Sequence, residues 1–366
     1  MYSVLVLGGY GFFGHRICAS LARVPSIRLL VAGRRRDRAM ETATRLSLGS
    51  DQALAIDAND GSLARVLQES GAQVLIHTAG PFQQQDYRVA RAAIEAGCHY
   101  IDLADGRQFV AGITALDDAA RERDVSVISG ASSVPALSSA AVDRFQPRFA
   151  QLESIELGIN SGARAPGLAT VRGIFGYAGR PFHNLTNDSW ATAHGWLGLR
   201  RHDFPSPLGA RWVCRCDIPD LALFPRRYPD VSTVSFEAGF ASDLGHLVVW
   251  GLAHLVKANV LPSASPFAAP LNRISRWIEP LVSDKGGMFV RLKGTDHDGK
   301  PLRITWNLIA QNNHGPFIPC GAAIALTQKL CSNMRLPSGA MPCMGLLSVE
   351  EYLAALPGLN LREIVE

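Results

Sequence analysis

The sequence predicts an α/β doubly wound parallel sheet, followed by a second α+β domain with a mostly antiparallel sheet. Two observations support this prediction. Up to about residue 130, short apolar runs alternate with helical stretches, which is the pattern of βαβ units and a parallel sheet. After about residue 143, β-rich runs follow one another, joined by long connections rich in Pro, Gly and aromatic residues.

The elements follow from apolar runs and from glycine or proline stops. The expected strands of the first part are 2–7, 27–32, 53–56, 74–78, 100–103 and 125–129. Its expected helices are 13–23, 39–47, 62–70, 86–96 and 116–123. In the second part we expect strands over 154–160, 169–177, 231–238, 288–293 and 303–311.

These elements divide the chain into three parts. Residues 1–130 form an NAD(P)-binding domain, and residues 131–320 form an α+β substrate or dimerisation domain with a helical insertion at about 243–281. Residues 321–366 form a C-terminal helical segment, with a helix over 322–330, that we expect to pack back on the first domain. A strand-rich second domain often provides a dimer face, so a homodimer is expected.

The composition is that of a globular protein with a sizeable core. Apolar residues make up 47% of the 366 residues and charged residues 19%. The net charge of +4 is too small and too evenly spread to indicate a nucleic-acid partner. The seven cysteines are scattered without the spacing of a metal site, which favours reduced thiols and a cytoplasmic location. The N-terminus lacks the pattern of a signal peptide.

One apolar stretch, Leu244 to Leu261, has two interpretations. It reads LGHLVVWGLAHLVKANVL and includes two histidines and a lysine. It is also shorter than the roughly 20 apolar residues that a membrane span needs. A buried or partner-facing helix is therefore the favoured interpretation, and peripheral membrane contact is the alternative.

A glycine-rich turn follows the first expected strand and opens the first expected helix. Three glycines satisfy GxGxxG at positions 9, 11 and 14, and the set 8, 11 and 14 satisfies GxxGxxG. Glycines permit the tight turn and let the backbone approach a pyrophosphate, which lies on the helix N-terminus. The alternative is a tight turn without a ligand. The context favours a Rossmann-type dinucleotide site formed by Gly8, Gly9, Tyr10, Gly11, Phe12, Phe13 and Gly14.

Arginines follow the second expected strand, where NAD-binding folds place an acidic residue. Arg34 lies 20 residues after Gly14, and no Asp or Glu stands at that position. A guanidinium can instead pair with a 2′-phosphate and stack on adenine. A solvated basic loop is the alternative. With the glycine turn, Arg34 and Arg35 favour NADP over NAD.

Further cofactor contacts are expected after the third and fourth strands, because ligands of open α/β sheets bind beyond the carboxyl ends of the strands. Asp57 and Ala58 lie where adenine rests, although Asp57 also fits a turn or helix cap. Ala79, Gly80 and Pro81 are placed to contact the nicotinamide ribose. His77 is expected to be a core histidine within its strand.

The segments VLVLGGYGFFG, AGPFQQQDYRVARAAIEAGCHYIDLADGRQFV and ISGASSVPALSSAAVD resemble the saccharopine dehydrogenase NADP-binding family. The resemblance covers most of residues 1–145, and later segments match in patches. It implies an oxidoreductase of the broad branch rather than the lysine-pathway enzyme. Two departures from the family pattern are Asp86, in place of a glycine, and Ser132-Ser133-Val134-Pro135, in place of a DPG-type turn.

Hydride transfer requires a positioned nicotinamide and one managed proton. His314, in the NNHGP loop, and Asp102, on the fifth strand, are the candidate catalytic residues. A plain loop histidine and a structural carboxylate are the alternatives. The sequence thus predicts an NADP(H)-dependent oxidoreductase with a small substrate between the two domains. A non-catalytic nucleotide sensor and a membrane-surface reductase of a lipid-like substrate are the alternative functions.

Overall fold

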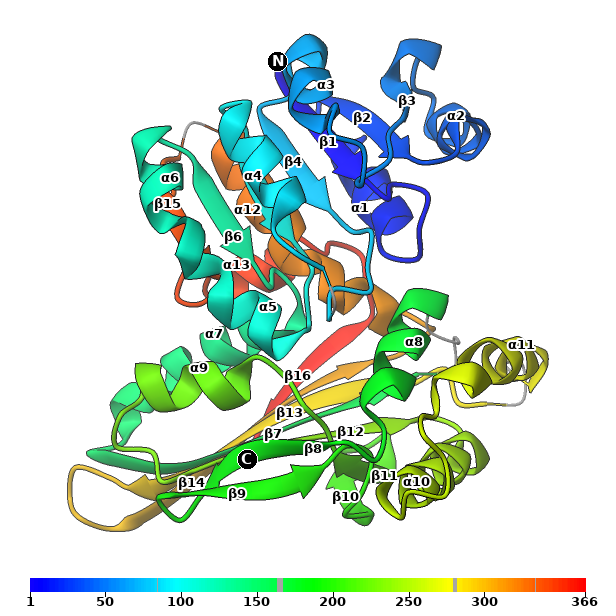
Figure 1. The fold of residues 1–366 in the computed structure, drawn as a ribbon. Coiled ribbons are helices and arrows are strands. Elements are labelled where there is room, and N and C mark those ends of the chain that lie inside the picture. The colour runs from blue at the N-terminus through cyan, green and yellow to red at the C-terminus, as the bar shows by residue number, and fades with distance from the viewer. Residues whose placement is uncertain (84, 163–166, 279–281, 333) are drawn as a thin grey trace. The chain divides into compact units, whose positions relative to one another are not determined.

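The computed structural model describes residues 1–83, 85–162, 167–278, 282–332 and 334–366. These residues form two compact units, each built from two separate segments of the chain (Figure 1). The first unit comprises Met1–Leu137 and Pro319–Leu356. The second comprises Ser138–Ile318 and Pro357–Glu366.

A seven-stranded sheet forms the centre of the first unit. Its order is β15-β6-β5-β4-β1-β2-β3, and every neighbouring pair is parallel. The strands are short, and most of their residues are buried, as expected of a sheet covered on both faces. Their bounds are β1 Tyr2–Leu7, β2 Ile27–Gly33, β3 Ala53–Ala55, β4 Val74–His77, β5 His99–Asp102, β6 Ser126–Ser129 and β15 Gly339–Pro342.

Helices cover both faces of this sheet (Figure 1). Leucine, valine, isoleucine and alanine side chains of α3, α4 and α6 form one core with alternate residues of the strands. On the other face, α1 contacts both the sheet and α12. The helices are α1 Gly14–Leu21, α2 Arg36–Arg45, α3 Leu63–Ser70, α4 Arg88–Glu95, α5 Arg107–Ala111, α6 Asp117–Glu122, α12 Gly321–Cys331 and α13 Val349–Ala354.

The second unit contains a mixed sheet with the order β10-β11-β12-β7-β13-β14-β16, in which only β12 and β7 pair in parallel. A separate hairpin joins β8 to β9. The strands are β7 Gln151–Ser161, β8 Pro181–Thr186, β9 Ser189–His194, β10 Arg200–Phe204, β11 Gly209–Arg215, β12 Thr233–Phe240, β13 Gly286–Thr295, β14 Pro301–Ala310 and β16 Leu361–Val365. Together the two sheets confirm the predicted fold class.

Helices accompany the second sheet, and the expected helical pair is present as two of them. These helices are α7 Ser138–Phe145, α8 Leu168–Tyr177, α9 Asp220–Arg227, α10 Asp243–Lys257 and α11 Ala268–Ile278. Residues 279–281, at the end of the expected insertion, lie outside the described residues. None of the helices that the structure describes is long and apolar enough to cross a bilayer.

The strand predicted over 169–177 is wrong, because this segment forms α8. The β-branched and aromatic composition suggested a strand. However, Val171, Ile174 and Phe175 have the spacing of one helix face, and Val171 and Phe175 are buried there. The hairpin β8–β9 was not predicted. Its turn contains Asn187 and Asp188, residue types that are common in hairpin turns, and both adopt positive φ.

The prediction of a helical C-terminal segment is incomplete. Residues 321–366 contain α12 and α13, but they also contain β15 and β16. β15 adds a parallel strand beside β6 in the first sheet, and β16 pairs antiparallel with β14 in the second. Both strands are short and lie at sheet edges, so their own sequences carry little signal apart from their long-range partners.

Candidate nucleotide-binding site

The turn between β1 and α1 can be built only from glycine at its key positions. Gly8 has a φ of +87°, and a Cβ there would lie 2.7 Å from Thr78 Oγ1. A Cβ on Gly14 would overlap the carbonyl oxygen of Gly8, and one on Gly11 would lie 2.9 Å from that same oxygen. The turn is closed by a hydrogen bond of 2.7 Å from Gly11 N to Gly8 O.

Backbone donors of this turn are available to a ligand. The N–H groups of Tyr10, Phe12 and Phe13 have no acceptor among the described residues. They precede α1, whose N-terminus carries a partial positive charge. Unpaired N–H groups at such a position bind phosphate. The residues present therefore fit the diphosphate of a dinucleotide.

Arg16, which the sequence analysis did not select, supports the turn from within α1. Its side chain is only 2% exposed. The guanidinium donates to the carbonyl oxygen of Phe12 and lies 4.3 Å from the centroid of the Phe12 ring. The residue stands one turn after Phe12, a spacing of four that could have suggested this contact.

The arginines after β2 differ in their surroundings. The hydroxyl of Tyr10 accepts a hydrogen bond from Arg35 N at 3.1 Å, and the Tyr10 ring lies against Gly33. The Arg35 guanidinium pairs with Asp37, with an Nε–Oδ1 distance of 3.2 Å. This hydrogen bond lowers the pKa of the Asp37 carboxyl. Arg34 is exposed and forms no ion pair within the described chain.

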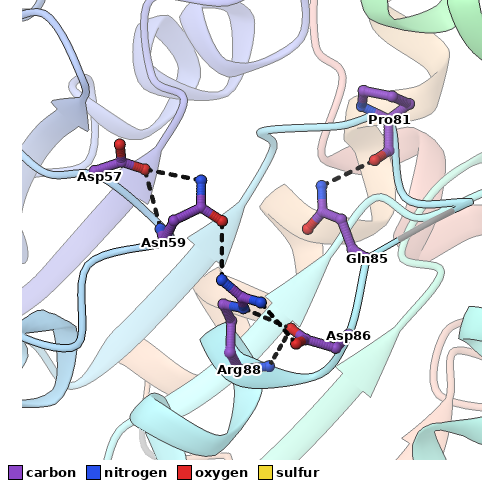
Figure 2. A network of polar contacts seen from close by, with 6 residues as sticks. All are labelled: Asp57, Asn59, Pro81, Gln85, Asp86 and Arg88. Atoms are coloured by element: carbon purple, nitrogen blue, oxygen red, sulfur yellow. Dashed lines mark hydrogen bonds and ion pairs between the residues drawn. The ribbon is translucent and has the colours of Figure 1, made fainter.

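The loop after β4 is held in shape by Gln85. Its Nε2 donates to Ala79 O at 2.8 Å and to Pro81 O at 2.9 Å, and the second bond is drawn in Figure 2. Thr78 anchors the start of this loop, because its Oγ1 donates to Leu7 O at 3.0 Å. The loop thus connects directly to the end of β1, beside the glycine turn.

A polar network links the loops that follow β3 and β4 (Figure 2). The carboxylate of Asp57 accepts from Asn59 N at 3.0 Å, and Asn59 Oδ1 accepts from Arg88 Nη1 at 3.1 Å. Arg88 pairs with Asp86 through Nε at 2.8 Å and Nη2 at 2.9 Å. Asp57 therefore shapes a turn, as the alternative interpretation expected, and a contact of Asp57 or Ala58 with adenine stays a prediction.

The polar side chains at the ends of β4 and β5 are buried. His77 is 1% exposed, its Nδ1 lies 3.0 Å from Tyr100 Oη, and burial lowers its pKa to about 4. This confirms the expected core histidine. Asp102 is fully buried, and burial raises its pKa to about 6 although its hydrogen bonds act in the opposite direction. Its Oδ1 accepts at 2.8–3.0 Å from Gly130 N, Ala104 N and Ser129 Oγ.

These bonds give Asp102 a structural role that ties the end of β5 to the residues after β6. A catalytic role for Asp102 stays a prediction. His314, in the second unit, accepts a hydrogen bond from Asn360 N at Nδ1, at 2.7 Å. A backbone N–H can only donate, so the neutral His314 ring carries its hydrogen on Nε2. A proton transfer by this residue would therefore use Nε2.

Comparison with known families decides what kind of domain carries this site. Residues 4–128 match the family described as "Saccharopine dehydrogenase NADP binding domain". This part of the chain is similar to that family. The match spans the glycine turn and the loops after β2, β3 and β4, so the candidate site lies in the part of the chain that is similar to an NADP-binding domain. The comparison with curated proteins found no match.

Solved structures extend the likeness to the full chain. Saccharopine dehydrogenase (L-Glu forming) from Saccharomyces cerevisiae, solved without ligand, superposes with a TM-score of 0.70 at 14% identity, and 100% of both chains is covered. Amine dehydrogenase from Mycobacterium smegmatis gives a TM-score of 0.51 at 11% identity, with 96% of this chain and 95% of that chain covered. The chain thus matches that domain family over residues 4–128 and shares the fold of these two structures over nearly its full length.

Proposed function

We propose that the protein is an NADP(H)-dependent oxidoreductase that acts on a small substrate. The observation that carries this proposal is the glycine turn, where the N–H groups of Tyr10, Phe12 and Phe13 have no acceptor in the described part of the chain. When bound, the cofactor would supply or accept a hydride at its nicotinamide. The chain would hold the diphosphate at the turn and the nicotinamide ribose at Ala79, Gly80 and Pro81.

The preference for NADP(H) is based on Arg34. Its guanidinium is exposed and unpaired within the described residues, whereas the charge of Arg35 is offset by Asp37. An unpaired guanidinium can form charge-assisted, bidentate hydrogen bonds with a 2′-phosphate. We therefore assign the 2′-phosphate contact mainly to Arg34 and give Arg35 a smaller part.

We assign the proton that accompanies the hydride to His314, through Nε2. The Asn360 N–H occupies Nδ1 and fixes the orientation of the ring, as expected of an acid–base residue held by its second nitrogen. The described structure shows no disulfide among the seven cysteines, and all of them are buried, which fits a reducing compartment, so we place the protein in the cytoplasm.

Untargeted mass spectrometry tests this function without a known substrate. The protein is incubated with NADPH and a metabolite extract, and compounds that gain two hydrogens are sought. We expect at least one such compound with the wild type and none with Gly14→Ala. His314→Asn is expected to slow its formation without changing the affinity for NADPH. If the wild type binds NADPH but reduces no compound, and the reverse assay with NADP⁺ oxidises none, the enzyme assignment is wrong.

A further inference from the structure

Helix α10 carries apolar side chains on its buried face and also on its exposed face. Residues spaced by three and four are buried against the second unit, namely His246, Val249, Ala253 and Val256. Yet large apolar side chains of the same helix reach solvent, namely Leu244 at 70%, Leu247 at 39%, Val248 at 37% and Leu255 at 42% exposure. The outer face of a surface helix is ordinarily polar, so this face is built for something other than water.

Exposed apolar side chains are concentrated in this part of the chain. Of the twelve large hydrophobic residues that are exposed in the described structure, eight lie between Leu244 and Trp277. Single exposed residues need no explanation, but such a concentration marks a binding surface. We use the name α10–α11 face for the part of this surface that is formed by Leu244, Leu247, Val248, Ile274 and Trp277.

The charges of the two helices are mostly positive. The described residues of α10 and α11 include Lys257, Arg273 and Arg276 but one acid, Asp243, and Glu279 follows α11 in the sequence. All three cations are exposed, and the described structure gives none of them an ion pair. Apolar side chains bordered by lysine and arginine are typical of helices that lie on anionic membranes.

A cavity of about 180 Å³ opens at the same place, in the space bordered by α8, α10 and α11. Figure 1 shows these three helices at one end of the second sheet. The inner wall is formed by apolar side chains, among them Val171, Phe175 and Leu271. Leu244, Val248 and Ile274 belong both to this lining and to the exposed α10–α11 face, so the cavity meets the face there.

The few hydroxyl groups of the cavity already bond the backbone. Ser242 Oγ accepts from Gly245 N at 3.1 Å and caps α10, and Ser275 Oγ donates to Asn272 O at 2.9 Å. A polar metabolite would lose its hydration in this cavity for little return. A hydrocarbon chain loses nothing and gains contact with apolar walls.

We propose that the α10–α11 face binds an anionic phospholipid bilayer and that one acyl chain enters the cavity. The proposal goes beyond the nucleotide site, because it uses none of its residues. A second copy of the chain is the competing occupant. A symmetric pair would bring Lys257, Arg273 and Arg276 towards their own counterparts, and Asp243 is the one acid in the described residues of α10 and α11 that could offset them. Anionic lipid complements both the charge and the apolar surface.

Vesicle flotation tests the bilayer contact. We expect the full chain to float with vesicles of equal parts phosphatidylcholine and phosphatidylglycerol, and much less with phosphatidylcholine alone. Replacing Lys257, Arg273 and Arg276 by glutamate is expected to weaken binding by about a hundredfold or more, because each cation is worth about a factor of five at an anionic surface. Flotation that is absent, or equal with both vesicles, would overturn the proposal.

Two variants with serine substitutions distinguish binding through the α10–α11 face from nonspecific binding by exposed apolar side chains. Ile274→Ser with Trp277→Ser removes side chains that are 52% and 79% exposed, and we expect it to abolish flotation. Trp190→Ser is the matched control, since Trp190 is 56% exposed on the β8–β9 hairpin. It is expected to float like the wild type. NADPH affinity is expected to be unchanged in all of these variants, so failure here is distinguishable from failure of the proposed function.

Crosslinking tests the cavity, and light scattering tests the rival occupant. With phosphatidylglycerol that carries a photoreactive group at the end of one acyl chain, we expect crosslinks to Val171, Phe175 or Leu271. Crosslinks confined to residues outside the cavity lining would contradict acyl-chain entry. If light scattering instead shows a dimer that Ile274→Ser with Trp277→Ser converts to a monomer, the face is an interface between copies and the proposal is wrong.

Discussion

The hydroxyl of Tyr10 accepts a hydrogen bond from the backbone N–H of Arg35 at 3.1 Å. Tyr10 belongs to the glycine turn after β1, and Arg35 follows β2. One side chain thus links the segment expected to bind the diphosphate to the segment expected to bind the 2′-phosphate. The ring also lies against Gly33, where a Cβ would come within 2.5 Å of it. The expected diphosphate site and the expected 2′-phosphate site are therefore joined by direct contacts of the Tyr10 side chain.

Removing only this hydroxyl tests the link. Tyr10→Phe keeps the ring against Gly33 but leaves Arg35 N without its acceptor. We expect the free energy of unfolding to fall by about 0.5–1.5 kcal/mol, the usual net value of one hydrogen bond. Urea denaturation followed by circular dichroism measures it. A variant as stable as the wild type would show that the bond contributes nothing.

The arginines test the cofactor preference. Arg34→Ala is expected to weaken NADPH binding by about 1.5–3 kcal/mol, the value of a hydrogen bond to a charged group, and to leave NADH binding unchanged. Arg35→Ala is expected to have a smaller effect because Asp37 already engages that guanidinium. Isothermal titration calorimetry measures both affinities. Arg23→Ala, at the end of α1 away from the glycine turn, is the control for loss of charge.

If Arg34→Ala weakens NADPH and NADH equally, Arg34 does not contact the 2′-phosphate. If Arg35→Ala weakens NADPH binding more than Arg34→Ala does, Arg35 and not Arg34 makes the main contact with the 2′-phosphate.

The close approach of Gly14 and Gly8 makes a single methyl group disruptive. In Gly14→Ala, the new Cβ would overlap Gly8 O, which is backbone and cannot move without opening the turn. We expect loss of measurable NADPH binding and a drop in stability of more than about 2 kcal/mol. Gly61→Ala is the matched control, since a Cβ there meets nothing within 4 Å. Equal NADPH affinity in both variants would contradict the geometry of the turn.

Asp102 gives the stability a specific pH dependence. Its pKa is raised from 3.8 to about 6 in the folded chain, so between these values the folded state binds more protons than the unfolded state. Asp102 thus contributes to the free energy of unfolding at low pH, and this contribution is lost as pH rises through about 6. The expected loss is about 3 kcal/mol at pH 7, from 1.36 kcal/mol per pKa unit.

Asp102→Asn removes this ionisation and keeps an oxygen that can accept from Gly130 N, Ala104 N and Ser129 Oγ. The difference in unfolding free energy between Asp102→Asn and the wild type is expected to grow in favour of the variant from pH 4 to pH 6. Taking the difference cancels the opposite contribution of His77, whose pKa burial lowers to about 4. A difference that does not change with pH would show that Asp102 titrates normally.

Much of the nucleotide-binding domain could be predicted because its signals are local. The glycine turn, the strand before it and the helix after it lie within a few residues, and each glycine has a steric reason that is visible in the sequence pattern. The arginines after β2 could be found by counting from Gly14. The sequence could not show that Asp37 pairs with Arg35, or that Arg34 has no ion-pair partner among the described residues, since both arginines look alike in a basic run.

The second unit was harder because its structure depends on distant partners. The segment 169–177 has apolar residues that suit a strand and also the spacing of a helix, and burial of Val171 and Phe175 decided for the helix. β16 pairs with β14 across about 50 residues of chain, a contact that no local pattern announces. The apolar stretch from Leu244 was visible in the sequence, but only the structure shows that its exposed side chains border a cavity.

Titration of the wild-type chain with NADPH and with NADH, followed by calorimetry and by quenching of nicotinamide fluorescence, tests the proposed cofactor site. We expect NADPH to bind at micromolar concentration or below and more tightly than NADH. We also expect Gly61→Ala to retain this binding and Gly14→Ala to lose it. If neither nucleotide binds the wild type at micromolar concentration, the glycine turn is only a turn and the proposed oxidoreductase function fails.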